Sequence, residues 1–430
     1  MSGLHAGAFP EDRVRERARR GAAAAFPPPE GYGRTLFGAG GTAASAVPDL
    51  LDAARIVPPV FMPQRLEKLI DLGREPMYGD VDLVTAVGGF RSALPVYLSA
   101  FGSTQVASGD LGQAVSRQAG RLGLPMVIGE NVVPVSGYGR IDPDGPRGLL
   151  GRIRAYLDEL PDGLGGVAVQ QSTEDADAEV WNLVYSDPSA LPLLESGRLA
   201  FELKVGQGAK PGLGGMTVVD GSAAGRLAGA YAIDDGVYGS DSPLRLRSSS
   251  PGTFTEEILR QQIRFMRNNF PRARIWVKLH PSRDVREAAA VAWLAGADAV
   301  TVDGAEGGTG WAPTAFLDHV GLPLGECLRQ LGRPTGPGSL LVTGRIWEGA
   351  RAVKALALGA TAVGLGRAAL LAADEDPRDG VRRLVECLEL ELRLLISAVG
   401  KYAASALGPE DVWPAPDAGV REETMAWHST

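Results

Sequence analysis

Residues 339–371 read SLLVTGRIWEGARAVKALALGATAVGLGRAALL. The stretch opens with an apolar run, Leu340 to Thr343, which stops at Gly344 and Arg345. A second apolar run, Thr361 to Gly364, follows a helix-patterned segment. This order predicts a strand, a glycine turn, a helix and a second strand.

The second strand also ends in a glycine and an arginine, Gly366 and Arg367. Glycine turns at the carboxyl ends of strands expose backbone N–H groups, which can hold a phosphate together with a helix N-terminus. In a (β/α)8 barrel, the loops after the last two strands are where phosphate sites are often built. The stretch therefore predicts a barrel that binds a phosphorylated cofactor.

Six further apolar runs precede this stretch, and most are followed by glycine or polar residues and then a helical pattern. They are Pro95 to Phe101, Leu124 to Ile128, Val167 to Gln170, Ala200 to Val205, Ile275 to Leu279 and Ala297 to Val302. Strands that alternate with helices indicate a parallel sheet, and eight of them fit a closed α/β TIM barrel. A doubly wound open sheet is the alternative, because periodicity alone does not show closure.

We expect a helical N-terminal arm over residues 1–80, the barrel over 81–404 and a C-terminal tail over 405–430. One helix is expected before Pro29, and two short helices between Val47 and Leu72 are expected to pack on the outside of the barrel. The interval from Gly206 to Ser250 is too long for an ordinary loop and too rich in glycine for a helix. It is a candidate cover for the mouth of the barrel.

The chain has 430 residues, 45% hydrophobic and 22% charged, which is typical of a globular protein with a sizeable core. Its formal net charge of −8 argues against nucleic acid or an anionic membrane as the main partner. The two cysteines lie far apart, so no metal site is predicted, and they fit a reducing compartment. With no stretch of about 18 apolar residues and no cleavage-like leader, a cytoplasmic protein is expected.

Two lysines, Lys204 and Lys210, flank a glycine-rich segment at the end of the fourth strand. Such a segment suits an anionic substrate such as a carboxylate, although a flexible loop with solvated lysines is equally compatible. Lys278 lies within the apolar fifth strand and points either into the barrel mouth or outward. Inside a flavin site, this cation stabilises the negative charge of the reduced ring. His280, two residues later, fits a structural hydrogen-bonding role better than catalysis.

Several motifs resemble the FMN-binding synthase domain of glutamate synthase, and they occur in the same order. They are LSAFGS at 98–103, GEN at 129–131, KVGQGAKPGLGG at 204–215, VKL at 277–279, GAEGGTGWAP at 304–313 and DHVGLP at 318–323. The resemblance covers roughly residues 90–400. It implies a TIM barrel with FMN at the carboxyl face.

The resemblance also implies roles for individual residues. Those expected to contact the flavin ring are Ser99, Ala100, Gln171 (with Gln170 as its alternative) and Lys278, the last at the N1/O2 edge. Those expected around the phosphate are Gly307, Gly308, Gly344, Arg345, Gly366 and Arg367. Those expected in the substrate pocket are Glu130, Lys204, Gln207, Lys210 and, as a carboxylate clamp, Arg226. Lys278, Glu130 and Lys210 are the candidate catalytic residues.

The sequence departs from that family in several places. The iron–sulfur cysteines, the glutaminase domain and the β-helix domain are missing, and Leu213 replaces a glutamate of the pocket. We therefore expect an FMN-dependent oxidoreductase that moves a hydride between flavin N5 and the α-carbon of an amino acid or 2-imino acid. An electron-donor or amidotransferase partner and a homo-oligomer are expected with it. An FMN-dependent 2-hydroxy-acid oxidase, or an FMN-binding subunit active only with partner chains, are the alternatives.

Overall fold

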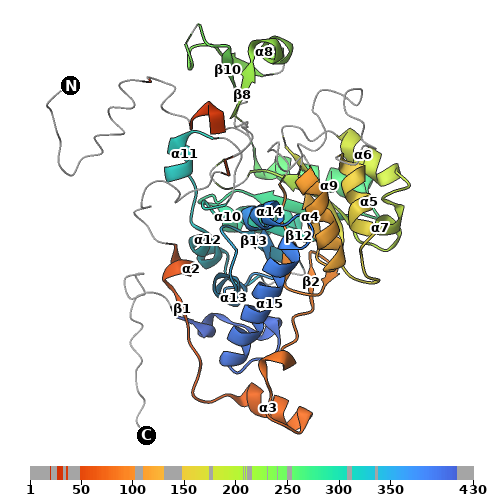
Figure 1. Ribbon diagram of the computed structural model, residues 1–430, viewed down its shortest axis with the longest axis vertical. Coiled ribbons are helices and arrows are strands. Elements are labelled where there is room, and N and C mark those ends of the chain that lie inside the picture. The colour runs from red at the N-terminus through yellow and green to blue at the C-terminus, as the bar shows by residue number, and fades with distance from the viewer. Residues whose placement is uncertain are drawn as a thin grey trace, which may run out of the picture.

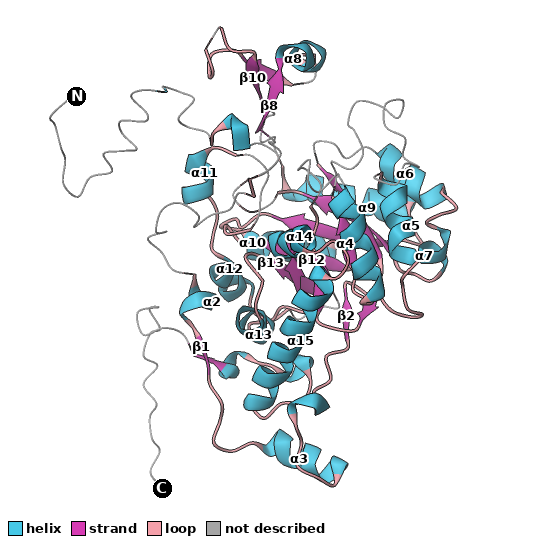
Figure 2. Cartoon of the chain, in the orientation of Figure 1, coloured by secondary structure: helices cyan, strands magenta, loops and turns pink. Residues whose placement is uncertain are grey.

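A closed barrel of eight parallel strands forms the body of the molecule (Figures 1 and 2). The strands are joined in the order β11-β12-β13-β14-β4-β5-β6-β7, and β7 pairs with β11 to close the ring. Their bounds are β4 Val96–Leu98, β5 Met126–Ile128, β6 Val167–Ser172, β7 Leu199–Lys204, β11 Arg274–Leu279, β12 Ala299–Asp303, β13 Ser339–Thr343 and β14 Ala362–Leu365. Each of the eight predicted runs overlaps one of these strands, so the predicted TIM barrel is confirmed and the open sheet is excluded.

The computed structural model describes part of the chain. The described residues are 20, 27–31, 35–36, 49–101, 110–129, 148–173, 178–206, 208, 210, 216–229, 231–239, 241–248, 254–307, 312–334 and 338–413. The helix expected before Pro29 lies almost wholly outside them.

Helices surround the barrel, as the cyan ribbons in Figure 2 show. They are α4 Asp110–Arg121, α5 Leu149–Leu157, α6 Ala178–Ser186, α7 Leu191–Glu195, α9 Glu256–Asn269, α10 Val285–Leu294, α11 Thr314–His319, α12 Leu324–Leu331, α13 Gly349–Ala357, α14 Arg367–Glu375 and α15 Gly380–Ala398. Local sequence determines where some of them begin. Thr255 caps α9 by accepting a hydrogen bond from the Ile258 N–H. Two glutamates in the first turn stabilise the helix further, because their negative charges lie at the positive end of the helix dipole.

Strand side chains divide into two sets because successive residues point to opposite faces. In β12, Val300 and Val302 pack in the large core between barrel and helices. Ala299, in contrast, belongs to a second core inside the barrel, together with Trp276 and Leu341. This inner core lies next to the polar groups in the carboxyl half of the barrel interior, which are described below.

A hairpin closes the amino end of the barrel. Its strands are β2 Thr85–Val87 and β3 Phe90–Ser92, joined by Gly88 and Gly89, which both have positive φ as a tight hairpin turn requires. The Trp276 indole donates a hydrogen bond of 3.0 Å to the Gly88 carbonyl. A Cβ on Gly88 would lie 2.2 Å from that ring, so only glycine allows this approach.

The two short helices expected before the barrel are present as α2 Leu50–Ala53 and α3 Pro63–Leu72. Helix α2 packs on α12 and α13, but α3 has no buried residue and stands off from the body (Figure 1). The 3-10 turn η3, Tyr78–Asp80, follows α3. Strand β1, Arg55–Ile56, pairs with β15, Val412–Trp413, and so joins the described ends of the chain. In the described part of the chain, no helix has the length and apolar character needed to cross a bilayer.

The sequence predicted no helix between Gly206 and Ser250, because the interval is rich in glycine. That prediction is wrong. The interval contains β8 Met216–Asp220, α8 Gly221–Leu227, β9 Ala232–Asp234 and β10 Leu244–Ser248, with an antiparallel sheet in the order β8-β10-β9. Figure 1 shows this excursion standing away from the barrel, at the end opposite α3. Pairing between segments that are distant in sequence stabilises it, and local composition does not report such pairing.

Candidate active site

The carboxyl half of the barrel interior is polar and centres on Lys278. This lysine shares the inward face of β11 with Trp276 and has only 4% of its surface exposed. Its Nζ lies 3.3 Å from Oδ2 of Asp303, which extends inward from β12. Of the two orientations that the sequence allowed, the structure has the one directed into the barrel. The ammonium is thus held in a largely dry interior.

Glu202 is a second buried carboxylate beside this lysine. Two side chains donate to it: the amide Nε2 of Gln170, and the Thr301 hydroxyl at 2.9 Å. Burial raises the pKa of Glu202, and the charge of Lys278 acts in the opposite direction. Glu202, on β7, therefore couples its own strand to the neighbouring β6 and to β12, which lies beyond β11.

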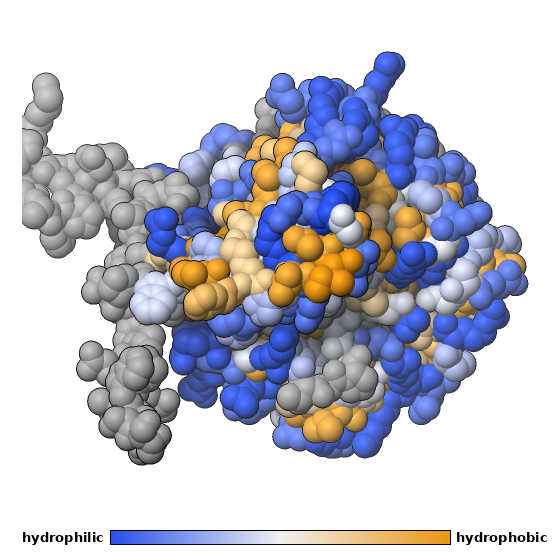
Figure 3. Space-filling model, turned by 90° about the horizontal axis from the view of Figure 1, so that it is seen from below, coloured by the Kyte–Doolittle hydropathy of each residue, from blue (hydrophilic) through white to orange (hydrophobic). Residues whose placement is uncertain are grey.

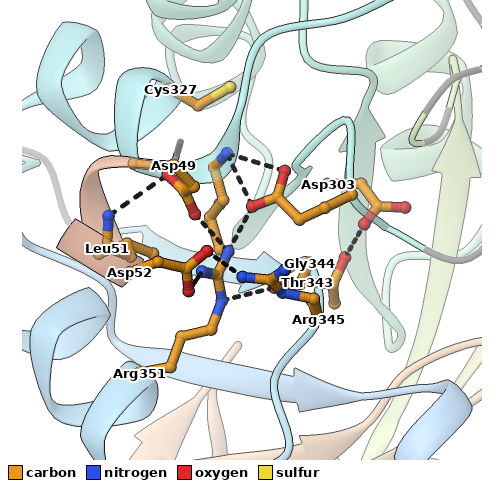
Figure 4. Close-up of polar contacts among 12 residues, drawn as sticks. Asp49, Leu51, Asp52, Asp303, Cys327, Thr343, Gly344, Arg345 and Arg351 are labelled. Carbon is orange, nitrogen blue, oxygen red and sulfur yellow. Dashed lines mark hydrogen bonds and ion pairs between the residues drawn. The ribbon is translucent and has the colours of Figure 1, made fainter. Parts of the chain in front are cut away.

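Asp303 is fixed from two further sides. The Thr343 hydroxyl donates to its Oδ1 at 2.5 Å, a contact visible in Figure 4. A Cβ on Gly307 would lie 2.1 Å from the same oxygen, so this glycine lets the loop after β12 close over the carboxylate. Asp303 therefore has little freedom to leave Lys278.

The residues predicted on β4 and β6 lie at the same end of the barrel. Ser99 is buried and donates its N–H to the Leu365 carbonyl at 3.0 Å, while Ala100 packs on the inner core. In β6, Gln170 faces the interior, so the strand alternation turns its neighbour Gln171 toward the helices. Gln171 donates to the Gln170 carbonyl instead. The geometry favours the alternative, Gln170, as the residue of the inner site.

The predicted phosphate region lies after β13 and β14. Gly366 has no side chain to cap α14, and a Cβ placed on it would meet nothing within 4 Å, so there is room beside this helix N-terminus. Arg367, partly buried, donates to the Glu306 carbonyl at 2.5 Å, and burial lowers its pKa. Arg345, which has a positive φ of 53°, pairs with Asp52 of α2. Gly344 also has a positive φ.

Arg351 organises a cluster next to this region, shown in Figure 4. Its buried guanidinium reaches Asp52 at 2.8 Å and Asp49 at 2.5 Å, contacts Glu306, and donates to the Gly344 carbonyl at 2.9 Å. The cluster therefore ties the segment before the barrel to the loops after β12 and β13.

Two carboxyl groups of this cluster, Asp49 and Glu306, titrate in opposite directions. Burial and the neighbouring Asp49 raise the pKa of Glu306 to about 8. Burial also opposes ionisation of Asp49, but its hydrogen bond with Glu306 and the charge of Arg351 outweigh burial and lower its pKa. The environment thus favours the protonated form of Glu306 and the ionised form of Asp49.

The remaining predicted residues are placed in part. Lys204 ends β7 on its inward side and is half-buried, as is Lys210. Arg226 belongs to α8 of the excursion, and its side chain is not described. Glu130, Gln207 and Gly308 lie outside the described residues.

Sequence reasoning missed Glu202, Asp303 and Arg351 as members of the site. A signal was present for the first two, because each is a carboxylate in an apolar strand, two residues from another inward position. No comparable signal existed for Arg351. It lies in an ordinary helical pattern, and two of its partners, Asp49 and Asp52, are some 300 residues earlier in the chain.

Comparison with known proteins agrees with the motif pattern. Residues 193–375 match the family model described as the conserved region in glutamate synthase. An archaeal-type glutamate synthase (NADPH) of Dehalococcoides mccartyi is 36% identical over 190 residues, which is 42% of this chain and 36% of that protein. A glutamate synthase large subunit-like protein of Rhizobium meliloti is 36% identical over 185 residues, 41% of this chain and 40% of that one. The matches thus span well under half of these relatives.

Solved structures share the fold. A soluble mutant of the membrane-associated (S)-mandelate dehydrogenase from Pseudomonas putida has a TM-score of 0.55 at 20% identity, covering 94% of this chain and 98% of that one. A variant of flavocytochrome b2 with sulfite bound has a TM-score of 0.53 at 16% identity, covering 94% and 85%. At these identities the likeness concerns the barrel architecture.

Proposed function

We propose, from the premise that residues 193–375 contain the conserved region of glutamate synthase, that this chain is an FMN-dependent oxidoreductase of the glutamate synthase type. Its substrate would be an amino acid or the corresponding 2-imino acid, which places it among enzymes acting on CH–NH2 donors. The chain matches only about a third of the length of the archaeal-type relatives, so the activity of those larger proteins is not transferred whole.

The observation that carries the proposal is the buried Lys278 between two buried carboxylates. A cation held at the carboxyl end of a barrel, above the apolar inner core, suits the edge of a flavin ring, because that ring gains negative charge on reduction. Asp303, 3.3 Å away, and the neighbouring Glu202 hold the Lys278 side chain in place.

The surroundings also offer groups that suit the phosphate and the ring of FMN. The space beside Gly366, the N-terminus of α14 and the nearby Arg367 would hold the phosphate. Ser99 and Ala100, which follow β4 on the side of the barrel opposite Lys278, and Gln170 of β6 would contact the ring. Arg345 would take part only by exchanging Asp52 for the phosphate, because the two residues are paired.

Bound FMN supplies the hydride chemistry, exchanging a hydride at N5 with the substrate α-carbon. The chain supplies binding and orientation. Lys204 and Lys210 would hold the substrate carboxylates as point charges, with Glu130, Gln207 and Arg226 as further candidates for the pocket. The glycines in the sequence after β7 would suit a close approach of the substrate to the backbone.

The test is the visible spectrum of the purified full chain, recorded before and after anaerobic addition of L-glutamate and then NADPH. We expect bound FMN and bleaching with one of the two reagents, and the reagent that bleaches it shows which half-reaction the isolated chain performs. Absence of flavin binding even after FMN is supplied would overturn the proposal.

An FMN-binding subunit that works only with partner chains is the second candidate, favoured by the limited overlap with the larger relatives. In that case FMN binds, but neither reagent bleaches it until an electron-donor or ammonia-supplying partner is added. Bleaching by a 2-hydroxy acid instead would assign the chain to 2-hydroxy-acid oxidation.

A further inference from the structure

Helix α3 and its flanking residues form an exposed apolar surface. We call residues 57–80 the arm. Helix α3 presents Leu66 and Ile70 on one face, with 59% and 67% of their surfaces exposed. Other exposed apolar side chains of the arm are Val60, Phe61, Leu72, Met77 and Tyr78. Figure 3, which looks at this end of the molecule, shows hydrophobic surface gathered at its centre.

The arm keeps a defined position although its apolar face is open. Arg65 donates to the Tyr402 hydroxyl at 2.6 Å and pairs with Glu75 at 2.9 Å. Met62 packs so closely on Gly400 that a Cβ there would lie 2.8 Å from its Cγ. Arg393 of α15 donates to the Val81 carbonyl just after the arm. A helix held this way presents a preformed surface.

The size of the surface matches one half of a protein interface. Seven large, substantially exposed apolar side chains offer on the order of 700 Å², close to the roughly 800 Å² that each partner contributes to an interface of standard size. Patches larger than a few hundred Å² are rare on monomers and mark interaction sites. Leu390 and Leu394, exposed on α15 on either side of Arg393, extend the apolar surface next to η3.

The charges on α3 identify the partner. The helix carries Arg65 and Lys68 against Glu67 and Asp71, so it is neutral within a chain of net charge −8. An antiparallel pair of such helices, centred on Lys68, sets Leu66 against Ile70 of the partner subunit. At 100° per residue, Arg65, Lys68 and Asp71 lie away from the Leu66/Ile70 face, so the pair buries no charge between the two helices. Helices that lie on anionic membranes have an excess of Lys and Arg on the polar face, which α3 lacks.

We propose that the arm is a dimer interface between two copies of this chain, with the two α3 helices packed antiparallel around a two-fold axis near Lys68. The arm leads into the hairpin that closes the amino end of the barrel, and it lies opposite the excursion (Figure 1). The dimer therefore leaves the carboxyl end of both barrels open. The proposal is independent of the flavin.

The first test is the mass of the full-length chain in solution, measured by light scattering after size-exclusion chromatography. We expect a dimer, or an assembly of dimers, for the wild type. In the double variant L66E/I70E the mass should fall by half, with a dimer Kd raised at least about 100-fold. The control, L294E, changes an 88% exposed leucine on α10 and should leave the mass unchanged.

The second test uses the predicted axis. In a C387S background, which removes the exposed cysteine, the double variant L66C/I70C should form a disulfide-linked dimer on oxidation, because residue 66 lies opposite residue 70 across the two-fold axis, whereas L294C should not. A monomeric wild type, a double variant that remains dimeric, or equal cross-linking of the two cysteine variants would overturn the proposal. So would a monomer that floats with phosphatidylglycerol vesicles and loses this binding in L66E/I70E.

Discussion

Lys278 has an environment that only a charged side chain satisfies. Its ammonium lies 3.3 Å from Asp303 and near Glu202, and both carboxylates are almost fully buried. Its removal would leave Asp303 as an uncompensated charge in the interior. The effect of a substitution should therefore depend on charge more than on shape.

We predict that K278M lowers the reduction potential of the bound flavin and slows its reduction about 100-fold or more. K278R, which keeps the charge, should recover part of both. The measurements are a spectroscopic redox titration and anaerobic stopped-flow reduction. A K278M protein that folds, binds FMN and keeps the wild-type potential would show that the ammonium is not at the ring edge.

Gly364 and Gly366 make a matched pair two residues apart on the same strand end. A Cβ on Gly364 would lie 2.4 Å from Cγ2 of Thr343 and 2.7 Å from Cζ of Tyr97, so G364A should cost about 1–3 kcal/mol of unfolding free energy. G366A has free space, so the apo protein should stay within about 0.5 kcal/mol of wild type. Denaturant unfolding measures both.

G366A has a second expected effect. If the phosphate lies beside this glycine, the added methyl group occupies part of its space, and the FMN Kd should rise while apo stability does not change. Unchanged FMN affinity in a stable G366A protein would place the phosphate elsewhere.

At the scale of elements, the Arg351 cluster holds α2 against the N-terminus of α12 and against α13. The Gly325 N–H of α12 donates to Asp49 at 2.9 Å, and Lys354 of α13 donates to the Leu51 carbonyl at 2.8 Å. Arg351 supplies the charge that allows these carboxylates to lie together. The segment is thereby held against the loops that carry the phosphate region.

We predict that R351M destabilises the protein by about 3–5 kcal/mol, because it leaves buried carboxylates without their cation. Hydrogen exchange should increase first in residues 49–54. The control is R329M on α12, whose exposed pair with Glu326 should contribute less than about 1 kcal/mol. Equal losses in the two variants would contradict the role given to the cluster.

Glu306 should make stability depend on pH. Its pKa is about 8 in the folded protein against 4.5 as the ordinary value, so the folded state retains a proton that the unfolded state has lost. The contribution is complete below about pH 4.5 and is lost as the pH rises through 8, with a slope of at most about 1.4 kcal/mol per pH unit.

E306Q should flatten the decline of unfolding free energy between pH 5 and 8, since an amide does not titrate there. E375Q, which changes an exposed glutamate on α14, should retain the wild-type slope. Parallel curves for wild type and E306Q would show that Glu306 is ionised in the folded protein at neutral pH.

At the scale of the whole molecule, the excursion between β7 and α9 is separable from the barrel. Met216 and Ser248 are paired across β8 and β10, so their Cα atoms are within about 5.5 Å. A two-residue Asn-Gly turn can therefore replace residues 217–247 without stretching the chain.

We predict that this excision leaves the barrel folded, with FMN affinity within about threefold of wild type. If Arg226 clamps the substrate carboxylate, turnover should fall with a raised KM, and the single variant R226A should show the same KM. Circular dichroism, FMN titration and steady-state kinetics are the measurements. Loss of the fold would show that the excursion is structurally required.

The sequence by itself determined the barrel. Strand and helix periodicities, and the glycines at strand ends, are local properties of the chain, so all eight strands were predictable within a few residues. The same local signals identified Lys278 and the turns after β13 and β14. The turns by themselves predicted a phosphorylated cofactor, and FMN followed from the resemblance of the motifs to the synthase domain of glutamate synthase.

Only the tertiary structure decided which polar groups meet. Closure of the ring sets the inward faces of β6, β7, β11 and β12 together, which oriented Lys278, selected Gln170 over Gln171 and brought in Glu202 and Asp303. Docking of α2 brought Asp49 to Arg351, and the lack of packing on α3 exposed its apolar face. These outcomes depend on contacts between segments far apart in the chain, which local periodicity does not encode.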